Sequence, residues 1–415
     1  LLRKLSVHGG HIGPHLGMVE ATLALHRVFD SPKDKITYDV SHQSYVHKML
    51  PGRRKAFLAT EASDEVSGSP HQQESEHDHF TIGHTSTSVS LACGLAKARD
   101  LRGGSENVIA VIGDGSLIGG EAYEGKHFKL TANIDLKNEE WTPIGTLQGE
   151  EVRPFQGTFD GDGYQITNLK ISNGGQYAGL FGHTEGAVIK SCNVTGKING
   201  YNYTGGIVGY ADANTKILNC SFQGNVKGKG EGRGGSVGYM SGGGEVSGCF
   251  VTGTETVDKE VGSIAEYDVG TIKNCYALAN VTATATATAR GVNAGGIAGT
   301  AWRGTIQNCV SLAESVSGSD YVNRIAGYNY NATLTNNYAW DGTTINGNPV
   351  SADDAGWVNG AALTYTNGEL SEQFSDIFKD TDSAWDFTDN GLPILKNVGG
   401  VQFSELPKCM TGVGF

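Results

Sequence analysis

Short apolar pairs flanked by glycine recur along the second half of the chain at a nearly constant spacing. The copies are AGLFG at 178–182, GGIVG at 205–209, GGSVG at 234–238, VGSIAE at 261–266, GGIAG at 295–299 and RIAG at 324–327. Their last residues lie 27, 29, 28, 33 and 28 positions apart. About ten residues after each copy, a second apolar stretch ends in Cys192, Cys220, Cys249, Cys275 and Cys309, with Asn337 at that place in the last copy.

This period predicts a mainly β chain that forms a right-handed parallel β-helix (β-solenoid) of coils about 28 residues long. One coil cannot bury its own apolar residues, whereas stacked coils place like residues on one another along a continuous core. Tight bends between sheets need the backbone freedom of glycine. We expect the five repeated cysteines to form a buried column of small side chains, because no paired C-x₂-C spacing indicates a metal site and stacked side chains do not point at one another as a disulfide requires.

Residues 1–125 have a different pattern, in which helical and extended segments alternate. Residues 17–29 predict a helix with Met18, Leu23, Leu25 and Val28 among good helix formers, and 88–99 predict a buried helix. Residues 35–40 and the β-branched run 107–112 predict strands, the latter covered on both faces. The alternation favours an α/β layer with a parallel sheet.

Composition supports the division into two regions. Ten of the 12 histidines lie before residue 85, and six of the seven cysteines lie after residue 190. We therefore predict an α/β segment at 1–125, a solenoid at 126–340, and a solenoid cap and tail at 341–415. The formal charge of −13 argues against nucleic acid and anionic membrane surfaces as partners. No apolar run is long enough for a transmembrane segment.

The end of the second predicted strand carries the first candidate chemistry. Gly113, Asp114, Gly115 and Ser116 follow the run 107–112 directly. Two glycines there permit close approach of a diphosphate, and a carboxylate between them can hold Mg²⁺. The same four residues are also ordinary turn chemistry.

Three histidines add weight to a site at this place. His11, His42 and His84 all lie in Gly- or Ser-rich stretches, which are more typical of site loops than of core positions. A lone histidine is usually structural or solvated. Three in loops that converge on one strand end make proton transfer plausible.

Four blocks of this region resemble 1-deoxy-D-xylulose-5-phosphate synthase, a transketolase-like enzyme that depends on thiamine diphosphate. They are GHIGPHLGMVEATLALHRVF, YDVSHQSYVHKMLPGRR, ESEHDHFTIGHTSTSVSLACGLAKA and NVIAVIGDGSLIGGEAYEG. The resemblance implies catalytic roles for His11 and His84, and Mg²⁺ binding by Asp114. The cofactor-binding residues that it implies are His42, His84, Thr85, Ser86, Gly113, Asp114, Gly115 and Ser116.

The chain departs from this family in two ways. The family has a second Mg²⁺ ligand, an asparagine at the end of the next apolar strand, and the only asparagine near that spacing is Asn138, in the polar stretch DLKNEEW. The family's second domain, with the glutamate that activates the cofactor, does not follow. We therefore expect a truncated segment that does not turn over pyruvate. The missing initiator methionine leads us to expect that the chain begins inside a longer protein.

Residues 128–397 resemble proteins with GLUG repeats, and Gly179-Leu180-Phe181-Gly182 is the nearest copy of that motif. The resemblance implies an extracellular or surface interaction module whose ligand, a protein or a glycan, is unknown. Asp160-Gly161-Asp162-Gly163 is more typical of a turn than of a calcium site, because position 171 is Ile. Residues 367–379 predict an amphipathic helix that closes the open end of the solenoid. The alternating segment 281–290 predicts an extended excursion.

Three hypotheses remain open. The chain is a β-solenoid binding module with a non-functional enzyme fragment, or a thiamine-diphosphate transferase that joins pyruvate to glyceraldehyde 3-phosphate and carries a solenoid appendage. The third hypothesis is that two coding sequences were joined artificially. The first region implies a cytoplasmic location and the second an extracellular one, so the two halves conflict.

Overall fold

The computed structural model describes most of the chain. The residues outside the description are 1–17, 40–42, 59–65, 82–87, 113–124, 149–150, 213, 231, 269, 285–291, 352, 366–369, 379–383, 388–390, 400–401 and 403–415. Contacts divide the chain into two units, Leu1–Ala122 and Tyr123–Phe415. The domain boundaries predicted within the second unit stay predictions.

The first unit is a small α/β arrangement around two parallel strands. Its elements are α3 (Val19–Val28), β1 (Lys35–Tyr38), α4 (Tyr45–Lys48), the π-helix η1 (Met49–Arg53), α5 (Lys55–Leu58), α6 (Ser88–Arg102) and β2 (Val108–Val111). Strand β1 pairs in parallel with β2. Ile36, Tyr38 and Val111 form its core, against which Met18 and Leu25 pack.

Several apolar residues of this unit are exposed. Leu23 and Val28, expected beside Met18 and Leu25, are 46% and 73% exposed, and Leu101 of α6 is 78% exposed. Strand β2 is half-buried at three of its four positions. The predictions of a strand covered on both faces and of a buried helix are therefore wrong. The physical reason is that the described sheet has two strands, which offer little surface to pack against.

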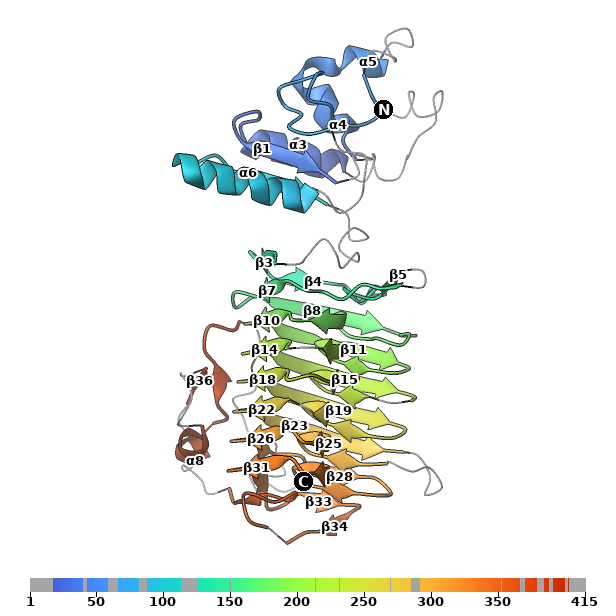
Figure 1. The fold of residues 1–415 in the computed structure, drawn as a ribbon, viewed down its shortest axis with the longest axis vertical. Helices are drawn as coiled ribbons and strands as arrows, with labels where there is room; N and C mark the ends of the chain where they lie inside the picture. The colour runs from blue at the N-terminus through green and yellow to red at the C-terminus, as the bar shows by residue number, and fades with distance from the viewer. Residues whose placement is uncertain are drawn as a thin grey trace. The chain divides into compact units, whose positions relative to one another are not determined.

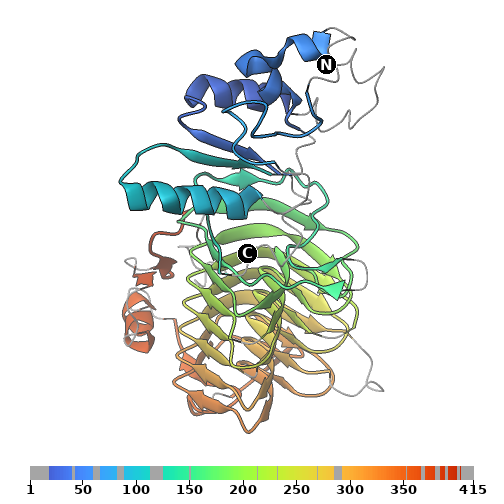
Figure 2. The ribbon, with the colours of Figure 1, turned by 45° about the horizontal axis from the view of Figure 1, so that its top comes forward.

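The second unit is a parallel β-solenoid, as predicted. Figure 1 shows its coils stacked along one axis, and Figure 2 shows successive strands lying one above the other. A typical coil passes through β10 (Val188–Lys190), β11 (Asn193–Gly200), β12 (Thr204–Gly205) and β13 (Val208–Asp212). Each of these strands pairs in parallel with its counterpart in the next coil.

The strands gather into four long sheets. The eight-stranded sheet contains β3 (His127–Lys129), β7 (Thr158–Asp160), β10 (Val188–Lys190), β14 (Lys216–Leu218), β18 (Glu245–Ser247), β22 (Thr271–Lys273), β26 (Thr305–Gln307) and β31 (Thr333–Thr335). The six-stranded sheet contains β9 (Phe181–Glu185), β13 (Val208–Asp212), β17 (Val237–Met240), β21 (Ala265–Asp268), β25 (Ala298–Trp302) and β30 (Ala326–Tyr330). The five-stranded sheet contains β12 (Thr204–Gly205), β16 (Arg233–Gly234), β20 (Val261–Gly262), β24 (Ala294–Gly295) and β29 (Val322–Asn323).

The twelve-stranded sheet is the broadest. It contains β4 (Ile134–Asp135), β8 (Gln165–Ile171), β11 (Asn193–Gly200), β15 (Ser221–Gly228), β19 (Phe250–Val257), β23 (Tyr276–Ala283), β27 (Val310–Ser311), β28 (Ser315–Ser317), β32 (Tyr338–Trp340), β33 (Thr344–Ile345), β34 (Asn348–Pro349) and β35 (Ala361–Leu363). Two antiparallel hairpins lie outside these sheets, β5 (Leu147–Gln148) with β6 (Glu151–Val152) and β36 (Trp385–Asp386) with β37 (Ile394–Leu395).

Like residues stack in columns inside the coils. In the eight-stranded sheet the column is Phe128, Phe159, Ile189, Ile217, Val246, Ile272, Ile306 and Leu334. The last glycine of the repeated motif has a steric reason, because a Cβ at Gly209 would meet the carbonyl oxygens of Tyr203 and Gly182. Residues 281–283, predicted as part of an excursion, instead continue β23, and 285–291 lie outside the described residues.

The cysteine column is buried, as predicted. All five cysteines are 0% exposed, and the backbone N–H of Cys220 donates to Sγ of Cys249 at 3.4 Å. In the last coil the side-chain oxygen of Asn337 accepts this bond from Cys309 at 3.0 Å. The residue before each column position has a left-handed backbone, which favours asparagine and glycine. These residues are Ser191, Asn219, Gly248, Asn274, Asn308 and Asn336.

The segment after the last coil returns along the side of the solenoid. Helix α8 (Leu370–Ile377) forms within the predicted range, with Leu370, Phe374 and Ile377 buried. Its cluster includes Phe250 and Tyr276 of the twelve-stranded sheet, and Figure 1 shows α8 and β36 beside the coils. The helix therefore packs along the flank rather than over the open end, because aromatic side chains on these coils offer an apolar surface.

The returning segment is tied to early and late coils by hydrogen bonds. Trp385 Nε1 donates to the carbonyl of Asn274 at 3.0 Å, and the Tyr276 hydroxyl donates to the carbonyl of Pro393 at 2.9 Å. Asn193 Nδ2 donates to the carbonyl of Gly399 at 3.0 Å. The described parts of this segment thus reach from Asn336, which follows β31 and donates to the carbonyl of Ile377, back to Gly163, which precedes β8 and accepts from the N–H of Gly399.

Candidate functional site

The residues predicted to hold thiamine diphosphate lie outside the described residues. These are His11, His42, His84, Thr85, Ser86, Gly113, Asp114, Gly115 and Ser116. Their catalytic, cofactor-binding and Mg²⁺-binding roles stay predictions.

The described residues next to these loops come together at one edge of the small sheet. Tyr38 of β1 lies opposite Val111 of β2, so the two strands end side by side. The N–H of Asp39 donates to the carbonyl of Val111 at 2.8 Å, and Asp39 Oδ1 accepts from the N–H of Ser88 at 3.2 Å. The ends of β1 and β2 and the start of α6 are thereby held together, which is where ligands of parallel sheets usually bind.

A buried ionic network holds the loop 66–81 against α4 and η1. Arg53 and His47 both contact the carboxylate of Asp78, at 2.9 Å from Nη2 and 3.3 Å from Nε2. Burial alone would raise the pKa of Asp78, but the hydrogen bonds from Arg53 and His47 outweigh it and hold that pKa well below its usual range. Lys48, fully buried, pairs with Glu74 at 2.9 Å. The first unit therefore keeps its own ordered polar core.

The asparagine near the spacing of the family's second Mg²⁺ ligand lies outside the first unit, as the sequence suggested. Asn138 belongs to the second unit, takes a left-handed turn with a φ of 57°, and donates from its N–H to the carbonyl of Asn168 at 3.2 Å. Among the residues that the structure describes, no group of three His, Cys, Asp or Glu side chains could hold a metal ion.

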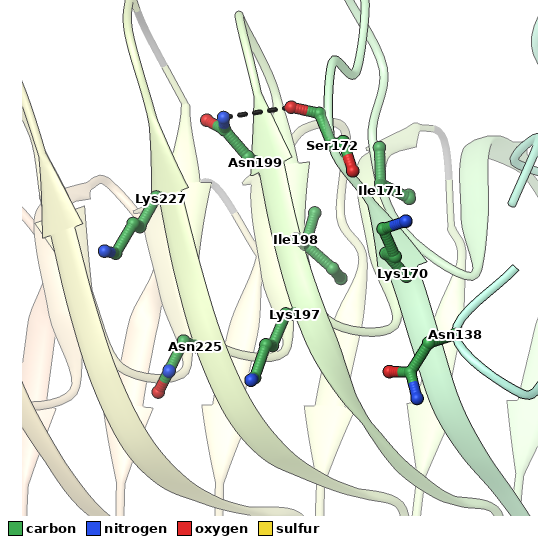
Figure 3. A pocket seen from close by; sticks show the side chains of 9 residues that line it. All are labelled: Asn138, Lys170, Ile171, Ser172, Lys197, Ile198, Asn199, Asn225 and Lys227. Atoms are coloured by element: carbon green, nitrogen blue, oxygen red, sulfur yellow. Dashed lines mark hydrogen bonds between the residues drawn. The ribbon is translucent and has the colours of Figure 1, made fainter. Parts of the chain in front are cut away.

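The described surface of the solenoid carries a groove of about 560 Å³ on the twelve-stranded sheet. Its walls come from β8, β11, β15 and the turn after β4 that contains Asn138 (Figure 3). The lining residues are Asn138, Lys170, Ile171, Ser172, Lys197, Ile198, Asn199, Asn225 and Lys227. Lysine and asparagine therefore dominate the groove, while the Ile171 and Ile198 side chains are almost fully buried beneath it.

Strand register explains why these side chains meet. Lys170, Lys197 and Asn225 are partners across β8, β11 and β15, and Asn199 is the partner of Lys227. Side chains alternate across a strand, so residues two apart face the same side. Ile198, between Lys197 and Asn199, therefore points inward and is 2% exposed. The lysines and asparagines consequently form two parallel rows on the outer face.

Aromatic side chains form a second surface feature on the six-stranded sheet. Tyr177 stacks on Tyr203 at 5.6 Å and on His183 at 5.4 Å, and Tyr210 stacks on Tyr239 at 5.2 Å between ring centroids. The ring faces are thus covered by one another. Burial lowers the pKa of His183, although Asp212 lies 4.0 Å away. This ladder is better explained as packing than as a stacking platform for a ligand.

The two aspartates of the turn at 160–163 each form an ion pair with a lysine. Asp160 pairs with Lys190 at 3.0 Å and Asp162 with Lys129 at 2.9 Å. Asp160 Oδ1 also accepts from the N–H of Asp162 at 2.9 Å. These contacts agree with the prediction of a turn.

Comparison with known proteins identifies two different resemblances. Residues 1–135 match the sequence model of 1-deoxy-D-xylulose-5-phosphate synthase. Residues 200–227 match the GLUG motif. Both resemblances drawn from the sequence are thus confirmed. The synthase match runs past β3, which pairs with β7 of the solenoid.

The relatives of the first region are close but much longer. The synthase of Geobacter metallireducens is 58% identical over 129 residues, which are 31% of this chain and 21% of that protein. The synthase of Desulfitobacterium hafniense is 59% identical over 144 residues, 34% of this chain and 23% of that protein. The chain therefore spans about a fifth of the length of the curated relatives it matches.

Solved structures similar to the chain include a putative immunoglobulin A1 protease from Bacteroides ovatus, with 21% identity over 68% of this chain and 88% of that one and a TM-score of 0.45. An IgA1 protease matches 68% of this chain and 25% of that one at 18% identity, with a TM-score of 0.37. Among the described helices, none is both long and apolar enough to cross a membrane.

Sequence reasoning did not single out the groove lysines. Lys170 stands in NLKI, Lys197 in GKIN and Lys227 in NVKG, each beside a residue of the inner column. Aligning the strands by their inner residues would have placed the lysines on one face. The signal was therefore present but weak, because lysine on a solvated strand face is common.

Proposed function

We propose that the β-solenoid is a non-catalytic module that binds an extended ligand, a protein or a glycan, and that the first segment performs no thiamine-diphosphate chemistry in this chain. The groove on the twelve-stranded sheet carries the proposal. It is concave, it is built from three successive coils, and its charged and amide side chains project from rigid strands. Sites on strands hold their geometry better than sites on loops.

Three acidic side chains of the described solenoid are held in ion pairs, which at these positions supports a binding role over hydrolysis. Asp160, Glu245 and Glu140 are each paired with a lysine, from Lys190, Lys273 and Lys170 respectively. Glycoside hydrolysis needs two carboxyl groups that flank a bond, one of them free to donate a proton. Carboxylates held in ion pairs are poorly suited to that task.

Binding is tested with the full chain immobilised against arrays of neutral glycans, acidic glycans and extracellular proteins. We expect saturable binding to members of one class, and the same chain unfolded by heat serves as the control. Absence of saturable binding to every class would remove the proposal.

The first segment is the basis of the second candidate function, a transketolase-type transferase that joins pyruvate to glyceraldehyde 3-phosphate. Its support is the 58% identity over 129 residues. Two observations argue against this function: Asn138 lies in the solenoid, and β3 pairs with β7. Both lie in the part of the chain where the family instead continues its own domain. A cofactor supplies its chemistry only when the protein orients and activates it.

Isothermal titration of the full chain with thiamine diphosphate and Mg²⁺ separates these two functions. We expect no binding tighter than millimolar. Micromolar, Mg²⁺-dependent binding would instead support the transferase.

The two regions also imply different origins and locations. We propose that they were joined from two coding sequences, one for a cytoplasmic enzyme and one for an extracellular module. Sequencing reads that run without a break through the codons for residues 113–126 in independent samples would contradict artificial joining.

A further inference from the structure

The three strands that form most of the groove carry lysines and no acidic residue. Strands β8, β11 and β15 together contain Lys170, Lys197 and Lys227 and no aspartate or glutamate. The chain as a whole has a formal charge of −13. A local basic surface can attract an anionic ligand even though the protein as a whole is acidic.

Two of these lysines are available for a ligand. Lys197 and Lys227 are exposed, and no described carboxylate lies within ion-pair distance of either ammonium group. Lys170 is 3.8 Å from Glu140, whose Oε1 also accepts from the N–H of Ser172. A ligand anion can therefore reach Lys197 and Lys227 without displacing a partner.

The asparagines add groups that suit hydroxyls. Asn138, Asn199 and Asn225 each have one acceptor and two donor hydrogens, and the Asn225 oxygen already accepts from the Thr254 hydroxyl at 2.9 Å. Asn199 is oriented by a hydrogen bond from Nδ2 to the carbonyl of Ser172 at 3.0 Å (Figure 3). Its side-chain oxygen remains directed away from that bond. Amides beside lysines thus match a ligand that carries both hydroxyl and acidic groups.

Spacing indicates a repeating ligand. Equivalent residues of neighbouring coils lie about 4.8 Å apart, which is close to the length of one pyranose residue in an extended chain. Lys170 and Lys197 lie opposite each other on neighbouring strands. Lys227 lies on the strand of the next coil, two residues after Asn225, the residue opposite Lys197. The lining contains no aromatic residue and no exposed large apolar side chain that would take up peptide side chains.

We propose that the groove across β8, β11 and β15 binds an acidic polysaccharide, whose carboxylate or sulfate groups contact Lys197 and Lys227 while its hydroxyls contact the asparagines. This proposal rests on the binding function proposed above and names its ligand class. An acidic peptide has the charge but not the hydroxyls, and is the alternative that the experiment tests.

Binding is measured by titrating the full chain with four probes, namely polygalacturonate, heparin, neutral dextran and poly-glutamate. The test variant is Lys197→Asn with Lys227→Asn, since Asn225 shows that asparagine fits the same row. The control variant, Lys216→Asn with Lys273→Asn, removes the same charge from the eight-stranded sheet.

We expect polygalacturonate or heparin, but not dextran, to bind, and the test variant to weaken that binding by about ten-fold, as expected for loss of one or two charge-assisted contacts. The control variant should change it by less than about two-fold, as for surface charges outside a site. Binding of polygalacturonate would show that carboxylate groups are recognised, and binding of heparin alone would show that sulfate groups are required.

Other outcomes overturn the proposal. Equal weakening by both variants would mean that net charge alone attracts the probe, and preference for poly-glutamate would assign the groove to acidic peptides. Binding of a neutral glycan or a protein, with no acidic glycan bound, would contradict this ligand class but leave the binding function intact. Failure of every probe and of the arrays above would remove both.

Discussion

Glu255 interrupts an aliphatic column inside the solenoid, and its burial predicts how the stability of the chain depends on pH. The column runs through Ile171, Ile198, Val226, Glu255, Val281, Val316 and Ile345. The Glu255 side chain is 2% exposed, and neither of its carboxylate oxygens has a hydrogen-bond partner among the described residues. Burial raises the pKa of this carboxyl well above its usual value of 4.5.

The expected effect on stability follows from proton linkage. The folded state holds a proton that the unfolded state releases, so the stability is fully present below pH 4.5 and falls as the pH rises toward the folded pKa. The loss is about 1.4 kcal/mol for each pH unit in that window. Burial of an unpaired polar group costs about 1–3 kcal/mol in addition. Glu255→Leu should therefore raise the free energy of unfolding at pH 7 by at least about 2 kcal/mol.

The assay is urea unfolding of the full chain between pH 5 and pH 8, followed by circular dichroism, with hydrogen exchange of peptides covering 250–257 to localise the effect. Glu255→Gln is the matched control, because it keeps the size and polarity of the side chain and removes the titration. Both variants should lose the pH dependence of the wild type, and only Glu255→Leu should be clearly more stable at pH 7.

Two results would refute this reasoning. If the wild type and Glu255→Leu lose stability in parallel as the pH rises, Glu255 is not the titrating group. If Glu255→Leu is less stable than Glu255→Gln, the column does not favour an apolar side chain at this position.

Further predictions concern the ends of the solenoid and the first unit. Arg324 is fully buried and donates to the carbonyls of Asn359 at 3.1 Å and Gly360 at 3.0 Å. Arg324→Met should lower the free energy of unfolding by about 2–4 kcal/mol and speed hydrogen exchange in 340–363. Unchanged exchange in that segment would contradict this role. Asp78→Asn should destabilise the first unit by about 1–3 kcal/mol at pH 7, because it removes the buried carboxylate that Arg53 and His47 both contact and leaves Arg53 only Glu74, at 3.4 Å. Since the pKa of Asp78 is depressed, its contribution is present above pH 3.8 and lost as the pH falls; exchange in 45–58 that is insensitive to acid would argue against it. Limited trypsin digestion should leave a core that begins near residue 126, because Val28 and Leu101 remain exposed in the first unit. Recovery of an intact, protease-resistant first unit would contradict this and would show that its ionic network is enough to keep the unit folded.

The junction between the two regions limits what each can do. The sheet of the first unit has two described strands, and the next strand of the chain, β3, pairs in parallel with β7 of the solenoid. Strand β3 is the end strand of the eight-stranded sheet, and among the described strands β1 and β2 pair only with each other. Whatever the origin of the chain, residues 127–129 are therefore committed to the solenoid, and the α/β layer is not continued by them.

Several features were predictable from sequence because they repeat. The period near 28 and the aliphatic residues at equivalent places determine which residues stack, as in the column from Ile189 to Ile306. The Asn-Cys pairs were visible in the repeats, although the reason for the asparagine, a left-handed backbone at each bend, became clear only from the dihedral angles. The exposure of Leu23 and Val28 was not predictable, because periodicity shows which residues could be buried and not whether a partner surface exists.

By itself, the sequence determined the type of coil, its length and the order of its inner residues, since stacking like on like is a property of the repeat. It also determined the two family resemblances. The tertiary structure alone decided which outer side chains meet. Lys197 and Lys227 are 30 residues apart in the chain but lie on adjacent strands, and α8 lies on the flank because of aromatic residues some 100 positions earlier. Such contacts depend on the register between coils and on where a distant segment finds an apolar surface, and neither is written in any local pattern of residues.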